Sequence, residues 1–348
     1  MRIPPHAALN ETVNLVKRIE PKAAGLANAV LRRALDAGLE ELLATITRDT
    51  DRVTKLSITY SHPNWVVLAL EEALKLDGRE AQLEALLAAN NETPIINLVA
   101  LSESAQSKLT ALGLETGMAS PISFELKGNP ESLISDEIRV QDQGSQLVAL
   151  VLAALMPQGA DVLDMCSGPG GKSAVLQSRM GSGTLTCMEP NPIRAKLVAD
   201  ALGPDTNAEI IIAPGQEAPT EAFDAVLLDA PCSGIGSLRR KPESRWRKTP
   251  AQLANLVKTQ RELLDSALAS LRPGGVLLYS TCSPVVLETN TQVAEVLARH
   301  QNLELIDLVP VLNDISPGLG LNKSRKTVQL WTQLHETDAM FMAAMRKK

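Results

Sequence analysis

Aromatic residues, paired cysteines and long apolar runs are all scarce in this sequence of 348 residues. Phenylalanine, tryptophan and tyrosine together make up 2% of it, which leaves few rings on which the bases of a nucleic acid could stack. The four cysteines lie 21, 45 and 50 positions apart, with no CxxC pair and no cluster with histidine. The spacing of a zinc site is therefore absent, and we expect no metal.

The apolar runs are too short for a membrane-spanning helix. The longest nearly unbroken one, residues 147–156, has ten residues, whereas a span needs about 20. Residues 1–14 contain no long apolar stretch either, so a secretory signal is not expected. These absences predict a cytoplasmic protein with no membrane partner, in which the thiols stay reduced.

The net charge of −6 is not that of a strongly basic nucleic-acid-binding domain, but positive charge is concentrated locally. Residues 237–248 hold six basic residues and one acidic residue. A run of this kind is either a solvated face or a groove for phosphates. Its basic members are Arg239, Arg240, Lys241, Arg245, Arg247 and Lys248.

Three regions follow one another along the chain, and length alone favours two domains with a small third. Residues 1–55 are predicted to be helical, because apolar residues recur at steps of three and four. We expect Leu26, Val30 and Leu31 in the core of this region. Residues 56–135 are more mixed and are predicted to form an α/β connector with short strands near residues 93–101 and 118–130.

From about residue 140 onward, strands alternate with helices. The strands are expected over residues 160–165, 184–190, 208–214, 222–231 and 275–283. This alternation predicts an α/β fold with an open, mostly parallel sheet over residues 136–348. Ligands bind such a sheet at the carboxyl ends of its strands, and the motifs described next lie at such ends.

The first of these strands runs into a glycine-rich turn, DMCSGPGGK, at residues 164–172. A P-loop requires glycine where this chain has Cys166, and the dinucleotide pattern GxGxxG is also absent. Glycines still let the backbone approach a ligand, and Glu189 at the end of the second strand is placed to hold ribose hydroxyls. A purely structural turn is the alternative, but the turn together with Glu189 favours an adenosine-containing cofactor.

Two thiols and a carboxylate are expected at neighbouring strand ends. Asp229 and Cys232 follow the fourth strand, and Cys282 lies at the end of the fifth. A free cysteine is most often buried, and we assign Cys187, inside an apolar strand, to the core. Two cysteines on adjacent strand ends, each beside small residues, favour chemistry, because a nearby cation such as Lys172 stabilises the reactive thiolate.

These motifs resemble those of the Sun-type RNA cytosine-C5 methyltransferases, and most closely the bacterial RsmB-like 16S rRNA enzymes. The resemblance rests on DMCSGPGGK, DAPCSGIGSLRRKPESRW and LLYSTCS, with weaker matches at SHPNW, VQDQGSQ and TDAMFMA. It covers nearly the whole chain. The helical start, HAALNETVNLVK and GLANAVLRR, is similar to the last helices of a NusB-like RNA-binding domain, so we expect the earlier helices of that domain to be missing.

The resemblance implies a Rossmann-like methyltransferase domain over residues 136–348, preceded by a partial NusB-like region and the mixed connector. It also implies S-adenosylmethionine as cofactor and 16S ribosomal RNA as partner, and we expect a monomer. Gln216 would substitute for an acid that the family carries after the third strand. The other cofactor-binding residues would be Cys166, Ser167, Gly168, Pro169, Gly170, Gly171, Lys172, Glu189 and Asp229.

The resemblance also implies a role for each catalytic residue. Cys282 would attack C6 of a cytosine, which makes C5 able to accept a methyl group. Cys232 would help to remove the C5 proton and release the product, Asp229 would hydrogen-bond the cytosine edge, and Lys172 would orient groups in the site. The target base must leave any stack to reach them, and the basic run would hold the RNA backbone.

Two other functions stay open at this point. A tRNA cytosine-C5 methyltransferase would share the motifs, but related tRNA enzymes often lack a NusB-like piece. A catalytically inactive ribosome-assembly protein would explain the short start and the altered third strand, but both thiols and Asp229 are present. The family's Glu-Asn pair is matched only loosely by Glu288-Thr289-Asn290, so no role is assigned there.

Overall fold

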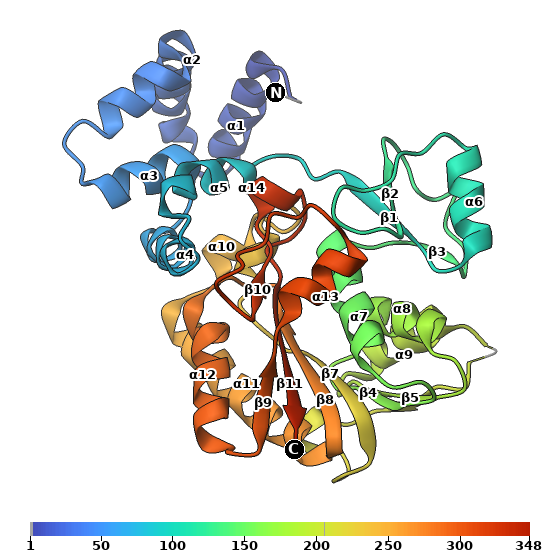
Figure 1. Cartoon of the computed structure of the whole chain (residues 1–348). Coiled ribbons are helices and arrows are strands. Elements are labelled where there is room, and N and C mark those ends of the chain that lie inside the picture. The colour runs from blue at the N-terminus through green and yellow to red at the C-terminus, as the bar shows by residue number, and fades with distance from the viewer. Residues whose placement is uncertain (1–2, 205) are drawn as a thin grey trace. The chain divides into compact units, whose positions relative to one another are not determined.

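The computed structural model describes residues 3–204 and 206–348. The chain divides into two compact units, Met1–Val67 and Leu68–Lys348. The first unit is helical, and the second contains two β-sheets (Figure 1). Among the helices in this described part of the chain, none has the length and apolar character that a membrane span requires.

The first unit is built from helices, as the apolar spacing predicts for residues 1–55. They are α1 (Pro5–Ile19), α2 (Ala24–Ile46), α3 (Arg52–Tyr60) and the start of α4 (Asn64–Leu76), with a 3-10 turn, η1 (Pro21–Ala23), before α2. The carboxylate of Asp51 caps α3 by accepting hydrogen bonds from the backbone N–H groups of Val53 and Thr54, which satisfies donors that a helix start leaves free.

The apolar surface of α2 is not buried as the sequence predicted. Leu26 and Val30 are 70% and 57% exposed, and Leu31 is half-buried. The assignment of Leu26 and Val30 to a core was wrong. Helical period determines which residues share a face, but not whether another segment covers that face.

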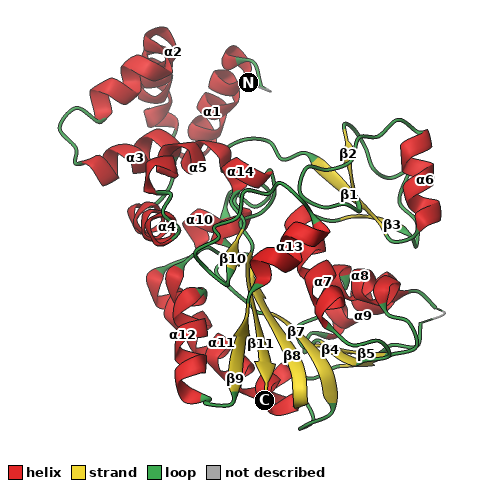
Figure 2. Ribbon diagram, viewed as in Figure 1, coloured by secondary structure: helices red, strands yellow, loops and turns green. Residues whose placement is uncertain are grey.

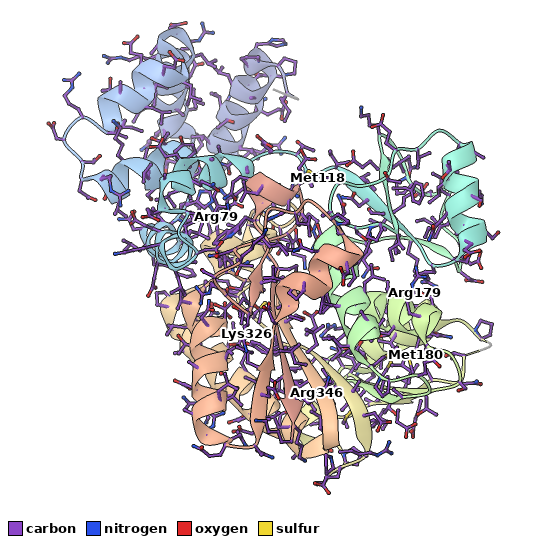
Figure 3. All side chains as sticks on the ribbon, viewed as in Figure 1. Arg79, Met118, Arg179, Met180, Lys326 and Arg346 are labelled. Carbon is purple, nitrogen blue, oxygen red and sulfur yellow. The ribbon has the colours of Figure 1, made fainter. Side chains whose placement is uncertain are left out.

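The second unit begins with the rest of α4 and a short helical segment. This segment comprises the 3-10 turn η2 (Glu80–Gln82) and α5 (Leu83–Ala89). Arg79, labelled in Figure 3, joins it to the C-terminal part of the same unit, because its Nη2 donates to the carbonyl of Gly320 at 2.7 Å. The carboxylate of Asp77 accepts a hydrogen bond from the indole of Trp331 at 2.8 Å.

A small antiparallel sheet follows. It has the order β2-β1-β3, with β1 (Ile96–Ala100), β2 (Ser123–Leu126) and β3 (Ile138–Val140), and it is accompanied by α6 (Glu103–Ala111). β1 and β2 are the two strands expected in this region. The side chain of Gln143 connects the small sheet to the next helix, because its Oε1 accepts from the backbone N–H groups of Ala119 and Ser120 at 2.7 and 3.0 Å.

The large sheet has the order β10-β11-β8-β7-β4-β5-β6, with β9 paired to β11 (Figure 2). Its strands are β4 (Asp161–Asp164), β5 (Thr184–Met188), β6 (Glu209–Ile211), β7 (Phe223–Asp229), β8 (Leu271–Thr281), β9 (Leu303–Ile306), β10 (Val328–Gln329) and β11 (Phe341–Lys347). β8, β7, β4, β5 and β6, in this spatial order, are parallel, which confirms the predicted α/β fold. β11 is antiparallel to β8. The sequence did not predict β9, β10 or β11.

Helices cover both faces of this sheet. They are α7 (Gln143–Leu155), α8 (Gly171–Arg179), α9 (Pro192–Leu202), α11 (Pro250–Ser270), α12 (Asn290–Arg299) and α13 (Leu308–Ile315), with the short α10 (Ser244–Arg247) and α14 (Thr332–His335) in connections. Successive strand residues alternate between two buried clusters, one formed with α7, α8 and α13 and the other with α11 and α12. With both faces covered, the carboxyl ends of β4, β5, β7 and β8 are left as the edge where a site can form.

Candidate active site

The glycine-rich turn after β4 lies so close to its neighbours that side chains at two of its glycines would clash with them. A Cβ added at Gly168 would lie 2.2 Å from Oε2 of Glu189. Gly170 has a φ of +99° and packs against α9, where an added Cβ would lie 2.6 Å from Cβ of Ala201. Ser167 ties the turn to β5, because its N–H and its hydroxyl both donate to the carbonyl of Met188, at 3.0 and 3.1 Å.

Glu189 stands at the end of β5 and is 2% exposed. Its Oε1 accepts from the backbone N–H of Asn191 at 3.0 Å, and its Oε2 forms an ion pair with Nη1 of Arg194 at 3.0 Å. The same guanidinium donates to the carbonyl of Gly168. Arg194 therefore holds the acid against the glycine turn. We did not predict this role, although Arg194 stands only five positions after Glu189, in the first turns of α9.

Asp229 and Lys172 form an ion pair between the end of β7 and the start of α8. Nζ of Lys172 lies 2.7 Å from Oδ2 of Asp229, and the hydroxyl of Ser280 donates to Oδ1 at 2.9 Å. Burial acts to lower the pKa of Lys172, but the nearby carboxylate of Asp229 raises it overall. The lysine is therefore a fixed positive charge that orients the carboxylate of Asp229.

The thiols of Cys232 and Cys282 are brought together as the sequence predicted, with 3.3 Å between their Sγ atoms. Both are free and half-buried. A hydrogen bond with Cys282, together with burial, raises the pKa of Cys232 well above its ordinary value. Cys232 therefore stays protonated and can donate its S–H to Cys282. Cys187 is fully buried in β5, which confirms its assignment to the core.

A cavity of about 430 Å³ opens over these groups, a volume within the range of small-molecule sites. Its lining includes residues from all three motifs: Cys166, Gly168, Glu189, Asp229, Cys232, Lys241, Lys248 and Cys282. Burial raises the pKa of Cys166, so this third thiol is unsuited to be a nucleophile. Gln216 is exposed in the 3-10 turn η3 (Gly215–Glu217) and does not line the cavity.

The basic run divides into structural and accessible residues. Arg245 was expected to hold the RNA backbone, but it is 2% exposed and donates to Oδ1 of Asn91 at 2.6 Å, so it is a buried structural residue instead. Arg240 forms an ion pair with Asp338. Lys241 and Lys248 line the cavity.

The remaining members of the run differ in exposure. Arg239 is half-buried, and Arg247 is exposed. Trp246, which we did not single out, is 62% exposed between Arg245 and Arg247. In the chain as described, no group of three or more histidine, cysteine or acidic side chains is arranged to hold a metal ion.

Comparison with known proteins gives a consistent set of relatives. Residues 152–346 match the family model for 16S rRNA methyltransferase RsmB/F, and residues 1–36 match the NusB family. Ribosomal RNA small subunit methyltransferase B of Pseudomonas putida is 34% identical and aligns over 88% of this chain and 72% of its own length. A protein of Mycobacterium tuberculosis that is predicted to be a methyltransferase is 38% identical and aligns over 99% of this chain and 77% of its own length.

A solved structure shares the fold. The crystal structure of a methyltransferase homologue from Pyrococcus horikoshii superimposes with a TM-score of 0.68 at 21% identity. The match covers 86% of this chain and all of that one.

Asp164, under the glycine turn, should make the stability of the protein depend on pH. Burial raises its pKa to about 7 from 3.8, although a hydrogen bond from Ser173 at 2.7 Å opposes this shift. Because the folded state binds this proton more tightly than the unfolded state, the free energy of unfolding should fall between about pH 4 and pH 7. Asp164→Asn should remove that loss, which is at most about 4 kcal/mol for three pKa units.

Urea unfolding at pH 5 and pH 8 measures this effect. The free energy of unfolding of the wild-type protein minus that of Asp164→Asn should be lower at pH 8 than at pH 5. Asp314→Asn, an exposed change on α13, is the control and should follow the wild-type pH dependence. A difference between wild type and Asp164→Asn that is the same at both pH values would contradict the assignment.

Proposed function

Since this chain belongs to the RsmB/F family of 16S rRNA methyltransferases, we propose that it methylates C5 of a cytosine in 16S ribosomal RNA through a covalent cysteine adduct. The observation that carries this proposal is the pair of thiols 3.3 Å apart, beside the ion pair of Asp229 and Lys172, in one cavity. Cytosine C5 is a poor nucleophile, and a thiol that adds to C6 is a direct way to activate it.

S-adenosylmethionine is the cofactor, and it supplies an electrophilic methyl group. The residues of the cavity fit it in three ways. Gly168 lets the carboxylate of Glu189 lie against the turn, that buried carboxylate suits ribose hydroxyls, and the carboxylates of Glu189 and Asp229 in the lining suit a cationic sulfonium. The turn over residues 166–172 and Glu189 would hold the cofactor, with Arg194 orienting the acid.

The two thiols can carry the cytosine ring through methylation and back to an aromatic base. The sulfur of Cys282, as thiolate, forms a bond to C6, and the electron pair of the C5–C6 double bond becomes available at C5. C5 takes the methyl group and then carries both a proton and a methyl. With the help of Cys232, that proton then passes to solvent water, and the electron pair of its C–H bond re-forms the C5–C6 double bond. The bond between sulfur and C6 breaks at the same time, which returns Cys282 as the thiolate. The net change replaces one hydrogen by a methyl group.

Asp229 and Lys172 act on the base rather than on the methyl group. A carboxylate at this position can accept a hydrogen bond from the exocyclic amino group of a cytosine that has left its stack. The bonds from Lys172 and Ser280 fix the direction of the carboxylate. The names of the relatives and the cations at the cavity support ribosomal RNA as the substrate.

The two thiols should give opposite results when each is removed. Cys282→Ala should abolish methylation and form no covalent adduct with RNA. Cys232→Ala should still attack the base, but product release should stall, so a protein–RNA adduct should accumulate. A denaturing gel of each variant, after incubation with 16S rRNA and S-adenosylmethionine, detects the adduct, and RNase should remove it.

Two outcomes of this experiment would count against the assignment. An adduct from Cys282→Ala but not from Cys232→Ala would reverse the roles of the thiols. Methylation that survives in both variants without any adduct would exclude the thiol mechanism. Cys187→Ala, a core thiol away from the cavity, is the matched control and should change stability without trapping RNA.

The lysines that line the cavity should bind RNA through phosphates. Replacing Lys241 and Lys248 with alanine should weaken binding to many RNAs alike and reduce the slope of log K against log salt by about 1.4–1.8 for two lost contacts. Filter binding of a 16S fragment at several salt concentrations measures this slope. Lys108→Ala with Lys258→Ala, an exposed pair outside the cavity lining, is the control. Equal slopes for the two double variants would show that Lys241 and Lys248 do not contact phosphates.

A further inference from the structure

Glu288 is a buried carboxylate at the thiol loops to which the proposed chemistry gives no role. It ends the 3-10 turn η5 (Val286–Glu288), six residues after Cys282, and is 0% exposed. A buried carboxylate is costly unless hydrogen bonds or opposite charges satisfy it. Its partners therefore indicate what it does.

Each carboxylate oxygen of Glu288 accepts two hydrogen bonds. Oε1 accepts from the backbone N–H of Ser233 at 2.7 Å and from Nε2 of Gln260 at 3.1 Å. Oε2 accepts from the hydroxyls of Ser233 and Ser283 at 2.5 and 2.6 Å. All four groups can act as donors, so each carboxylate oxygen has partners that match its role as an acceptor.

Regular strand pairing ends before it reaches the thiols. The ladder between β7 and β8 stops at Asp229 and Ser280, whereas the sulfur atoms belong to residues 232 and 282. Glu288 bonds to the residue immediately after each thiol. Its carboxylate therefore connects the two loops where the ladder no longer does.

Glu288 is itself held by two other elements. Its backbone carbonyl accepts a hydrogen bond from the hydroxyl of Tyr279 in β8 at 2.7 Å. Gln260 of α11 also donates to the carbonyl of Pro231 at 2.9 Å. Within residues 3–204 and 206–348, no basic side chain forms an ion pair with Glu288, so hydrogen bonds alone satisfy it.

We propose that Glu288 is a positioning residue that holds the loops of Cys232 and Cys282 in register, so that the two sulfur atoms face one base. The inference rests on the thiol mechanism proposed above. In Glu288→Gln, one acceptor oxygen becomes an amide nitrogen, which cannot accept from a serine hydroxyl. The link through residue 288 is then weakened, and the loops keep only the contact between the hydroxyls of Ser233 and Ser283 and the bond from the N–H of Gly236 to the carbonyl of Cys282. A displacement of about 1 Å at a reacting atom can cost about 100-fold in rate.

Single-turnover methylation of 16S rRNA tests this proposal. Glu288→Gln should slow methyl transfer by about 100-fold while the affinities for S-adenosylmethionine and for rRNA stay within about twofold of wild type. A purely structural role would lower the fraction of folded protein and both affinities instead. Glu295→Gln, the same chemical change at a partly exposed residue of α12, is the control and should leave the rate unchanged.

The adduct separates failure of this proposal from failure of the mechanism. In a Cys232→Ala background, adding Glu288→Gln should slow adduct formation by a similar factor. Equal adduct rates with and without Glu288→Gln would overturn the positioning role. No adduct in Cys232→Ala alone would contradict the thiol mechanism and, with it, this inference.

A second variant covers the case in which Glu288→Gln does not fold. Ser283→Ala removes the bond to Glu288 on the Cys282 side and leaves both bonds between Glu288 and Ser233. It also removes the contact between the hydroxyls of Ser283 and Ser233 at 3.1 Å and the bond that Ser283 accepts from the N–H of Val285 at 3.2 Å. It should slow methyl transfer by about tenfold with unchanged affinities, a smaller effect because one of the two connections remains. A wild-type rate in Ser283→Ala would overturn the proposal.

Discussion

The parallel pairing of β7 with β8 is the constraint on which the site depends. Its last register pair sets Asp229 opposite Ser280, and the backbone N–H of Ala230 continues it by donating to the carbonyl of Ser280 at 2.9 Å. Residues 232 and 282, 50 positions apart in sequence, therefore leave the sheet side by side. The contact between the two Sγ atoms follows from that register, and the pairing of β4 with β7 then brings Lys172 to Asp229.

Charge in the site is arranged in separately satisfied pairs and networks. Lys172 neutralises Asp229, Arg194 pairs with Glu189, and hydrogen bonds satisfy Glu288. The cavity lining carries two carboxylates, Glu189 and Asp229, and three cations, Arg194, Lys241 and Lys248. The net charge of −6 for the whole chain therefore says little about the field at the site.

The sequence predicted the parallel part of the sheet, the glycine turn and the approach of the two thiols, because these follow from local pattern and from the geometry of strand ends. The resemblance to RsmB-like enzymes is confirmed by the family match. The exposure of Leu26, the burial of Arg245 and the antiparallel β11 were not predictable in this way. Each depends on which distant segment packs alongside, and Arg245 finds its partner Asn91 154 positions away.

Replacement of the C5 hydrogen of cytosine is the central claim of this account, and tritium at that position tests it most directly. A 16S rRNA transcript labelled with tritium at cytosine C5 should release one tritium to water for each methyl group that the protein transfers, and Cys282→Ala should release none. Methyl incorporation without tritium release would show that the methyl group goes elsewhere and would contradict the account.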